Sequence, residues 1–402
     1  MKKIYLFLLS TLLIVCTVSA TVVNVRTCGA VGNGTTDDTQ AFITAIAAAS
    51  TNTGNTGGIL YIPAGRYLIT QTLVLDRARG LIIEGEGSMG YCANFSASYC
   101  TQSVLIWGGM AGGTLMQASG TYSCSIRDLA FAGKQYGGSD ANRAGILFLA
   151  VSVTGFGNII NHFENLSFTD AITGIQLGVN VSDSCNSDMS FAFVNFSNLD
   201  AAVRVKNNQG CDLLFNYSFA LNCQKVFEME RSGNIMVNNL QCTNCPLVVE
   251  VLGGGRTCGT YLFNNVRLEA SDGGASSRSQ LLRSYPIAGT AMIRFINFQD
   301  AQWAWYENPG AQNIPLCDVG PYTTVVFDTS IFNSYVASIT GSATNPATVI
   351  LNNCYLDYVS PDNITYLCLT ANTYGYYKMT DCRDWAKIWK NRSKWPADAD
   401  MR

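Results

Sequence analysis

The sequence predicts an all-β fold, a solenoid of parallel strands with a short N-terminal capping helix. The composition of 402 residues includes 37 Gly and only 9 Pro, which favours short strands and tight turns over long helices. A motif of apolar residues around an Asn or Asp recurs through the middle of the chain, at intervals as short as 21 residues (Asn195 to Asn216) and 22 residues (Asn216 to Asn238). A repeat of about 22 residues is the length of one coil of a parallel β-helix.

Residues 1–20 have the pattern of a secretory signal peptide. Lys2 and Lys3 precede an apolar run, residues 4–15, and Val18-Ser19-Ala20 has the small residues that a signal peptidase accepts. The run is shorter than the ~20 residues that a membrane-spanning helix needs. We therefore expect cleavage after Ala20 and a secreted, extracellular protein without membrane association.

Residues 21–56 are predicted to form an N-terminal strand and a capping helix. An apolar strand over 22–25 is followed by a glycine-rich turn and then by the helical pattern of residues 40–49. Asp37 or Thr36 is expected to cap the free amide groups of this helix, and the second acid, Asp38, is expected beside the positive end of the helix dipole. Capping therefore explains this acid pair better than a catalytic dyad does.

Residues 57–360 are predicted to form the β-helix as one domain. Brief apolar runs broken by Gly and Pro fill residues 58–87 without helical periodicity. The repeated motif follows, and its Asn side chains are expected to form a hydrogen-bonded ladder in one turn of the coil. Its polar positions are Asn165, Asn195, Asn216, Asn238, Asn264, Asn297, Asp328 and Asn352.

A second set of strands lies between the Asn positions and defines one outer face. Strand alternation sends alternate residues into the core: Ile175, Leu177, Val203, Val205, Phe227, Met229, Val249 and Val251. The outward positions are Gln176, Arg204, Lys206, Glu228, Glu230 and Glu250. Residues 361–402 mix apolar and basic residues and are expected to cap the C-terminal end of the solenoid.

The charge, the cysteine content and the glycosylation sequons indicate which partners and modifications to expect. Only 13% of residues are charged and the net charge is −3, so neither nucleic acid nor an anionic membrane is an expected partner. After signal cleavage 14 of the 15 Cys remain, an even number that predicts disulfide bonds in an oxidising compartment rather than a metal site. Glycosylation sequons predict N-linked glycans at Asn94, Asn165, Asn180, Asn195, Asn216, Asn363 and Asn391.

Three N-terminal motifs resemble the pectate lyase superfamily. They are VRTCGAVGNGTTDDT over residues 25–39, IPAGRY over 62–67 and IEGEG over 83–87. The resemblance implies a single-stranded right-handed parallel β-helix, the pectin lyase-like solenoid shared by rhamnogalacturonase-like and polygalacturonase-like enzymes and phage tailspikes. It also implies a carbohydrate-active protein, a glycoside hydrolase or polysaccharide lyase that acts on an extracellular, acidic polysaccharide.

The best-known active-site motifs of that superfamily are absent. Polygalacturonases share Asn-Thr-Asp, Asp-Asp, Gly-His-Gly and Arg-Ile-Lys motifs, and the comparable strands here, at 172–174, 200–202 and 223–225, lack them. No cofactor is required for hydrolysis, and calcium would be needed only by a lyase. The alternative is therefore a non-catalytic scaffold, coat or adhesion protein that binds glycans or assembles structurally.

Paired carboxylates on the outer face are the sharpest candidate site. Glu228 and Glu250 occupy equivalent positions on successive coils, and Glu230 points the same way. Two carboxylates at such spacing suit a glycosidase, with substrate bound by Arg204, Lys206 and Gln176. The alternative is a surface ladder of ion pairs, Arg204 with Glu228 and Lys206 with Glu230, that stabilises the coils.

Overall fold

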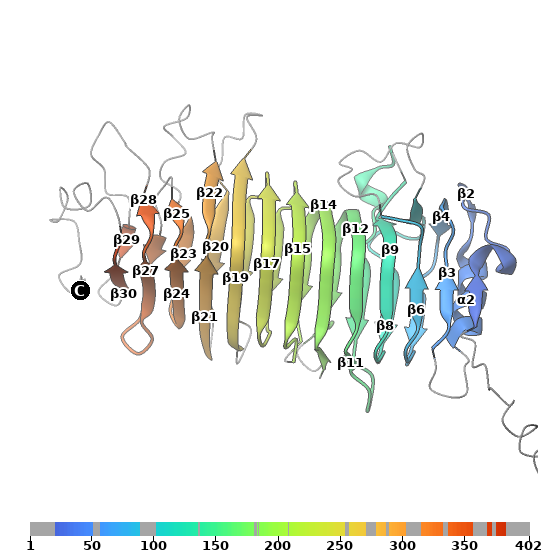
Figure 1. Ribbon diagram of the computed structural model, residues 1–402, viewed down its shortest axis with the longest axis horizontal. Coiled ribbons are helices and arrows are strands. Elements are labelled where there is room, and N and C mark those ends of the chain that lie inside the picture. The colour runs from blue at the N-terminus through green and yellow to red at the C-terminus, as the bar shows by residue number, and fades with distance from the viewer. Residues whose placement is uncertain are drawn as a thin grey trace, which may run out of the picture.

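The structure is a computed structural model, and the predicted parallel β-helix is its fold (Figure 1). The residues that it describes are 21–50, 57–88, 102–135, 137–180, 183, 185–207, 209–253, 257–270, 279–286, 289–302, 315–332, 337–356, 368–371 and 375–382. The predicted signal peptide and most of the predicted C-terminal cap lie outside these residues. So do the sequons at Asn94, Asn363 and Asn391. No helix in the described part of the chain is long and apolar enough to span a membrane.

The N-terminal elements close one end of the solenoid. They are β1 (Val22–Asn24), the 3-10 helix η1 (Val25–Cys28), β2 (Asn33–Asp37) and α2 (Thr39–Ser50). The helix is where the sequence predicts it, and it buries Phe42, Ala45, Ile46 and Ala49 against the first coils.

Asp37 and Asp38, the two acids before α2, have different hydrogen-bond partners. The Asp37 carboxylate accepts hydrogen bonds from the Thr39 amide at 3.0 Å and from the Thr70 hydroxyl at 2.7 Å, which confirms it as a cap of the helix start. The Asp38 carboxylate instead turns back and accepts from the amides of Val31 at 2.7 Å and Gly32 at 3.1 Å. Asp38 directly precedes α2, and its backbone carbonyl accepts from the Phe42 amide at 3.1 Å, so its interaction with the helix dipole stays a prediction.

Strands account for most of the rest of the described chain. They are β3 (Ile59–Tyr61), β4 (Gly65–Ile69), β5 (Leu73–Asp76), β6 (Ile82–Glu84), β7 (Ser103–Trp107), β8 (Thr114–Ser119), β9 (Ser125–Ala132), β10 (Ile146–Val151), β11 (Asn158–Ile159), β12 (His162–Leu177), β13 (Asn186–Ser187), β14 (Met189–Val205), β15 (Leu213–Leu221), β16 (Lys225–Met229), β17 (Ile235–Thr243), β18 (Leu247–Val251), β19 (Thr257–Ala270), β20 (Gln280–Ser284), β21 (Gly289–Ile296), β22 (Gln299–Gln302), β23 (Cys317–Val319), β24 (Thr323–Asp328), β25 (Ile331–Phe332), β26 (Ala337–Ile339), β27 (Ala347–Asn352), β28 (Tyr355–Leu356), β29 (Cys368–Ala371) and β30 (Gly375–Thr380). One further 3-10 helix, η2 (Asp140–Asn142), lies between β9 and β10.

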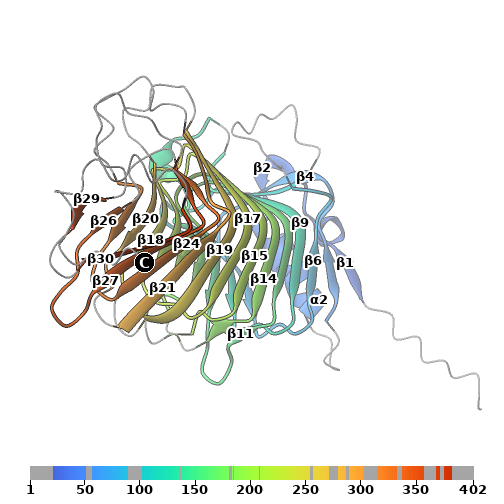
Figure 2. The same ribbon diagram turned by 60° about the vertical axis from the view of Figure 1, so that its left-hand side comes forward.

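Parallel pairing between successive coils builds the three faces of the solenoid, which we call sheets A, B and C, and a separate two-stranded sheet of β11 and β13. Figure 2 shows the strands stacked one coil behind the next. Sheet A starts at β1, β3 and β6 and continues through the first part of β12 to β30. Sheet B starts at β2, β4 and β7. Sheet C comprises β5, β8, β10, the C-terminal parts of β12 and β14, and then β16, β18, β20, β23, β26 and β29.

An Asn ladder forms at a corner between sheets, but only part of the predicted set joins it. The register aligns Asn216, Asn238 and Asn264, and the Asn238 amide donates to the Asn216 carbonyl oxygen at 2.9 Å. Asn165 and Asn195 lie outside this column, because Ala192 is the residue that pairs with Asn216. Asn297 is also outside it and donates to Asn265 instead. A separate ladder, between sheets B and C, runs through residues with left-handed backbone and includes Asn198, Asn222 and Asn244.

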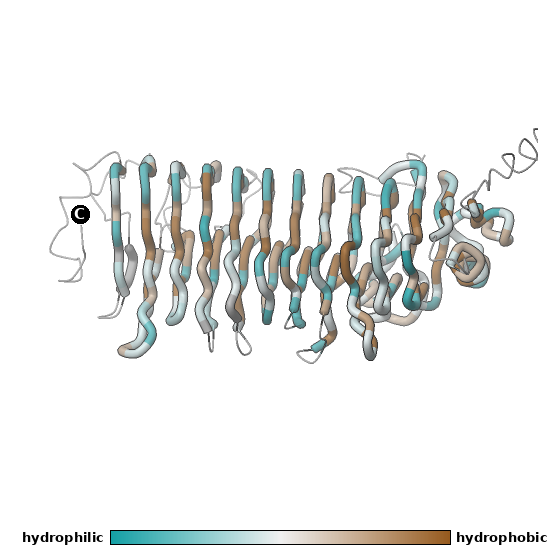
Figure 3. The backbone as a smooth tube through the Cα atoms, turned by 60° about the horizontal axis from the view of Figure 1, so that its bottom comes forward, coloured by the Kyte–Doolittle hydropathy of each residue, from teal (hydrophilic) through white to brown (hydrophobic). Residues whose placement is uncertain are grey.

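Stacked aromatic side chains fill the interior. The ring centroids of Phe163 and Phe191 are 4.6 Å apart, and those of Phe191 and Phe215 are 4.4 Å apart. Figure 3 shows apolar segments recurring on successive coils. All eight residues predicted to point inward from sheet C are buried. Each fully buried side chain of this size stabilises the fold by about 1.5–3 kcal/mol.

No disulfide bond joins the following cysteines of the described chain: Cys28, Cys124, Cys185, Cys211, Cys223, Cys242, Cys245, Cys354 and Cys382. Several point into the core and donate to backbone carbonyls, as Cys354 does to Phe327 at 3.5 Å. Disulfide bonds therefore remain a prediction.

Candidate functional site

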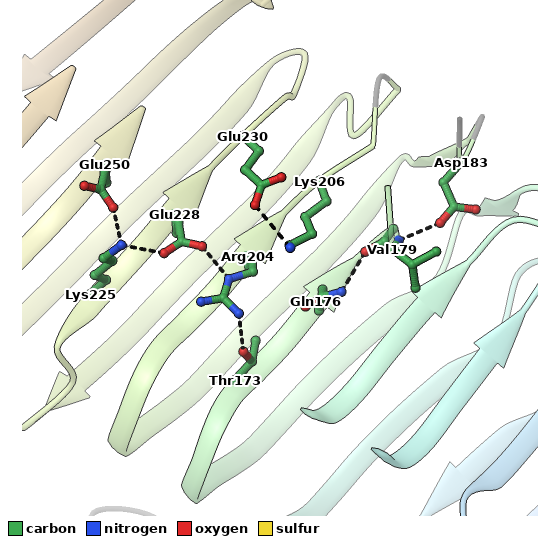
Figure 4. A network of polar contacts seen from close by, with 11 residues as sticks. Thr173, Gln176, Val179, Asp183, Arg204, Lys206, Lys225, Glu228, Glu230 and Glu250 are labelled. Atoms are coloured by element: carbon green, nitrogen blue, oxygen red, sulfur yellow. Dashed lines mark hydrogen bonds and ion pairs between the residues drawn. The ribbon is translucent and has the colours of Figure 1, made fainter. Parts of the chain in front are cut away.

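The outward residues of sheet C form one continuous column, as predicted from strand alternation. The register of the paired strands aligns Gln176, Arg204, Glu228, Glu250, Arg283 and Asp318. We call this set the charged column. Figure 4 shows its central part, where basic and acidic side chains from different coils face one another.

Both oxygens of Glu228 have cationic partners. Its Oε1 pairs with Nε of Arg204, and its Oε2 accepts from Nζ of Lys225 at 2.6 Å. Arg204 is held in turn by the Thr173 hydroxyl, which accepts from Nη1 at 3.0 Å. Burial alone would raise the pKa of Glu228, but the hydrogen bonds from Lys225 and Arg204 outweigh it and lower the pKa. Glu228 is therefore held as a carboxylate and is a poor proton donor.

Lys225 bridges Glu228 to Glu250 on the next coil. Nζ of Lys225 also pairs with Oε2 of Glu250, while Nη1 of Arg283 lies 3.4 Å from Oε1. Burial would lower the pKa of Lys225, but its hydrogen bonds to the two glutamates raise it. Both glutamate side chains are only 7% exposed, so the lysine is the main counter-charge between two buried carboxylates.

The remaining predicted site residues lie at the ends of this network. Glu230 pairs with Lys206 at 3.1 Å, and the buried Gln176 donates to the Gly178 carbonyl at 2.9 Å. Arg204 with Glu228 and Lys206 with Glu230 are the two ion pairs that the ladder interpretation predicts. The catalytic role of Glu228, Glu230 and Glu250 stays a prediction.

A polar pocket of about 380 Å³ opens at the edge of sheet C where its strands begin. We call it the sheet C pocket. The segment between β9 and β10 and the corner before the sheet C strands both contribute to its lining: Lys134, Asp140, Arg143, Asp170, Asn198, Leu199, Asp200, Asn222 and Gln224.

Charged groups from distant parts of the chain meet in this pocket. Nη2 of Arg143 donates to both carboxylate oxygens of Asp200, at 2.9 and 2.7 Å. Lys134 pairs with Asp140, and this hydrogen bond lowers the pKa of the exposed Asp140 carboxyl. The Asp200 side chain remains 44% exposed, so solvent or a ligand can reach it.

Asp170 ends the ladder of amides between sheets B and C. It has left-handed backbone (φ 57°), like Asn198 on the next coil, and its Oδ1 accepts from the Asn198 amide at 3.3 Å. Its Oδ2 accepts from the Thr169 hydroxyl at 2.9 Å. A carboxylate thus takes the place that amides occupy on the following coils, and it faces the pocket.

Asp170 and Asp200 line the sheet C pocket from neighbouring coils. Ala171 pairs with Leu199 and Thr173 with Ala201, so Asp200 lies beside residue 172. Adjacent strands are ~4.8 Å apart, and the two acids are also offset along the strand direction. Carboxyl groups roughly 6.5–9.5 Å apart hold a water molecule between them in inverting glycosidases.

The sequence prediction missed this pair because it followed strictly alternating strand positions. Asp170 lies at a corner and Asp200 two residues beyond the equivalent corner. The sequence does contain a pattern that could have indicated this pair: the dipeptides Thr169-Asp170 and Leu199-Asp200 follow the repeated motif on successive coils. Arg143 had no signal, because only the stacking of coils brings it to Asp200.

The described sequons differ in accessibility. Asn180 is exposed, whereas Asn165, Asn195 and Asn216 are half-buried. Within the described ranges, no group of three or more His, Cys, Asp or Glu side chains is arranged to hold a metal ion.

Comparison with known proteins gives both a family and a fold. Residues 22–275 match the family described as rhamnogalacturonase A/epimerase, pectate lyase-like. Comparison with curated proteins found no match. Among solved structures, DFA-IIIase from Arthrobacter chlorophenolicus A6 in complex with GF2 is similar with a TM-score of 0.59 and 13% identity, over 93% of this chain and 97% of that one.

Two other solved structures have the same fold. The catalytic unit of the GH87 alpha-1,3-glucanase from Streptomyces thermodiastaticus has a TM-score of 0.53 and 15% identity, over 94% of this chain and 71% of that one. The Dettilon tailspike protein has a TM-score of 0.53 and 13% identity, over 90% of this chain and 68% of that one. At these identities the likeness shows the fold alone.

Proposed function

The chain belongs to the rhamnogalacturonase A/epimerase, pectate lyase-like family, and from this premise we propose that it is a carbohydrate-active enzyme that acts on an extracellular polysaccharide. The names of two structural neighbours, a DFA-IIIase bound to GF2 and an alpha-1,3-glucanase, support a carbohydrate substrate. Fold alone does not decide the reaction, so the proposal depends on the chemistry of the site.

The observation that carries the proposal is the carboxylate pair of the sheet C pocket. Glycoside hydrolysis by inversion needs one carboxylic acid that protonates the leaving oxygen and one carboxylate that activates water. We assign the base to Asp200, whose two oxygens face the Arg143 guanidinium. We assign the acid to Asp170 on the neighbouring coil. Arg143 would also orient an acidic group of the substrate.

The charged column would support substrate binding beside the pocket. Arg204 and Lys206 project from the same sheet face and stay 20% and 26% exposed. Their charge suits a uronate-containing polysaccharide. The further features of this proposal are secretion after signal cleavage, N-linked glycans and disulfide bonds.

The direct test is to incubate the mature protein with acidic and neutral polysaccharides, with and without calcium. New reducing ends without ultraviolet absorbance of unsaturated uronates would support hydrolysis. Reducing ends with that absorbance would assign β-elimination instead, together with the calcium requirement expected of a lyase. Loss of either activity in an Asp200→Asn variant would place the chemistry in the pocket.

A non-catalytic scaffold or adhesion protein is the second candidate. The observation that favours it is the pairing of Glu228, Glu230 and Glu250, because each of these carboxylates has a basic partner. If circular dichroism shows that the protein is folded and it forms no product from any polysaccharide, the scaffold is favoured over the enzyme.

A further inference from the structure

Two arginines near the N-terminal end of sheet C lie over aromatic rings. The guanidinium carbon of Arg77 is 5.1 Å from the ring centroid of Phe156. That of Arg79 is 5.5 Å from Phe156 and 5.7 Å from the ring centroid of Tyr122. We call these four residues the arginine-aromatic patch.

A tight turn builds the patch from three coils. Val153 and Phe156 exchange backbone hydrogen bonds at 2.9 and 2.8 Å, and Gly155 between them has φ 80°. The turn packs onto Gly120, where an added Cβ would lie 2.8 Å from Cβ of Phe156. Only glycine fits there, and this close contact brings the Phe156 ring over the arginines of an earlier coil.

The two guanidinium groups have no acidic partner among the described residues. Arg127, Arg143, Arg204, Arg267, Arg283 and Arg294 each pair with a carboxylate. Asp76 is next to Arg77 in sequence, yet forms no ion pair with it in the described part of the chain. Both arginines are exposed, and so are Tyr122 (40%) and Phe156 (36%).

We infer that the arginine-aromatic patch is an accessory binding site for an anionic polysaccharide, recognised through its carboxylate or sulfate groups. A guanidinium that lies over a ring and has no acidic partner keeps its N–H groups available for bidentate pairing with such an oxyanion. The exposed ring edges add apolar contact for the sugar. Two cations on a chain of net charge −3 are too few for nucleic acid or a lipid surface, where binding scales with the number of neutralised phosphates.

The position of the patch extends the proposed function. Arg77 follows β5 at the edge where the sheet C strands end, and the sheet C pocket opens at the opposite edge. The patch is therefore separate from the pocket and would bind a part of the polysaccharide away from the bond that is cleaved. The inference rests on the proposed polysaccharide substrate but requires no catalysis.

Affinity electrophoresis in native gels tests the site. Polygalacturonate and dextran sulfate are the anionic probes, and dextran is the neutral probe with the same backbone as dextran sulfate. We expect at least one anionic probe to retard the wild-type protein, dextran not to retard it, and the Arg77→Gln/Arg79→Gln variant to bind about tenfold more weakly or worse. Phe156→Ala should weaken binding to a smaller degree.

A matched control separates the site from total charge. Arg267→Gln/Arg294→Gln makes the same charge change at exposed side chains away from the patch, and should bind like the wild type. Equal losses in both double variants, or no retardation by either anion, would overturn the inference. So would arginine-dependent binding confined to phosphatidylserine vesicles or DNA. If the Asp200→Asn variant is inactive but an anionic probe still retards it, the patch is supported independently of catalysis. If the wild-type protein is retarded but cleaves no polysaccharide, the proposed enzyme is refuted and the binding site is not.

Discussion

Replacing Lys225 by Met tests whether the charged column is a neutralised network. The substitution keeps most of the apolar stem and removes the ammonium group that pairs with both Glu228 and Glu250. These glutamates are directly paired across two strands, so the variant leaves two like charges side by side on a buried surface. Like charges in that position destabilise a sheet.

The size of the effect follows from burial. Removing one partner of a buried ion pair costs roughly 3–5 kcal/mol. Lys225 is 31% exposed, and Arg204 and Arg283 still face the two carboxylates. We therefore expect a loss of about 2–3 kcal/mol in the free energy of unfolding at pH 7, scaled down from the fully buried case. Lys206→Met removes the partner of the more exposed Glu230 and should cost less than about 1 kcal/mol.

Urea unfolding followed by circular dichroism measures the difference at several pH values. The folded-state pKa of Glu228 is lowered, so its contribution to stability is present above the unfolded pKa of about 4.3 and is lost as the pH falls through the folded value. The cost of Lys225→Met should therefore shrink in acid. Lys225 has a raised pKa, so its own contribution persists at neutral pH and is lost only as the pH rises through its folded value.

A second substitution shows whether repulsion is the cause. Adding Glu250→Gln to Lys225→Met removes one of the facing charges and should restore about half of the lost stability. A cost below about 0.5 kcal/mol at pH 7 for Lys225→Met, or a cost that does not change with pH, would refute the neutralised network, since a surface pair behaves that way.

Three other predictions address the site, the core and the cap. Asp200→Asn should lower kcat on any cleaved polysaccharide by about 10²–10⁴ and leave the urea midpoint unchanged. Glu228→Gln should keep kcat within about threefold of the wild-type value. If an initial-rate assay shows the larger loss for Glu228→Gln, the active site lies on the charged column instead. Phe191→Ala should lower the free energy of unfolding in urea by about 3–5 kcal/mol, because the ring is fully buried. Phe193 is 52% exposed, so Phe193→Ala should lower it by about 1 kcal/mol or less. Similar losses in the two variants would contradict the assignment of inner and outer faces. Asp38→Ala should cost about 2 kcal/mol, because it leaves two backbone amides without their acceptor, and an unchanged midpoint would show that water replaces the carboxylate.

Much of the fold was predictable because its signals are local. Alternation along a strand places Val203 in the core and Arg204 on the face without reference to any other coil, and the structure agrees. The repeat length then brings Arg204 to Glu228, since equal coils align equal positions. Asn165, Asn195 and Asn297 were misplaced in the ladder, because corner residues with left-handed backbone shift the register by one to three residues and such corners carry no fixed sequence spacing.

The sequence by itself determined the solenoid, its capping helix, the inward and outward residues of sheet C and the pairing of charges along it. Only the tertiary structure decided where a ligand can enter. The sheet C pocket needs Arg143, from the segment between β9 and β10, beside Asp200, 57 residues later in the chain. That contact depends on how many residues each coil inserts and where the chain turns, and these are properties of stacked coils that no local pattern of residues encodes.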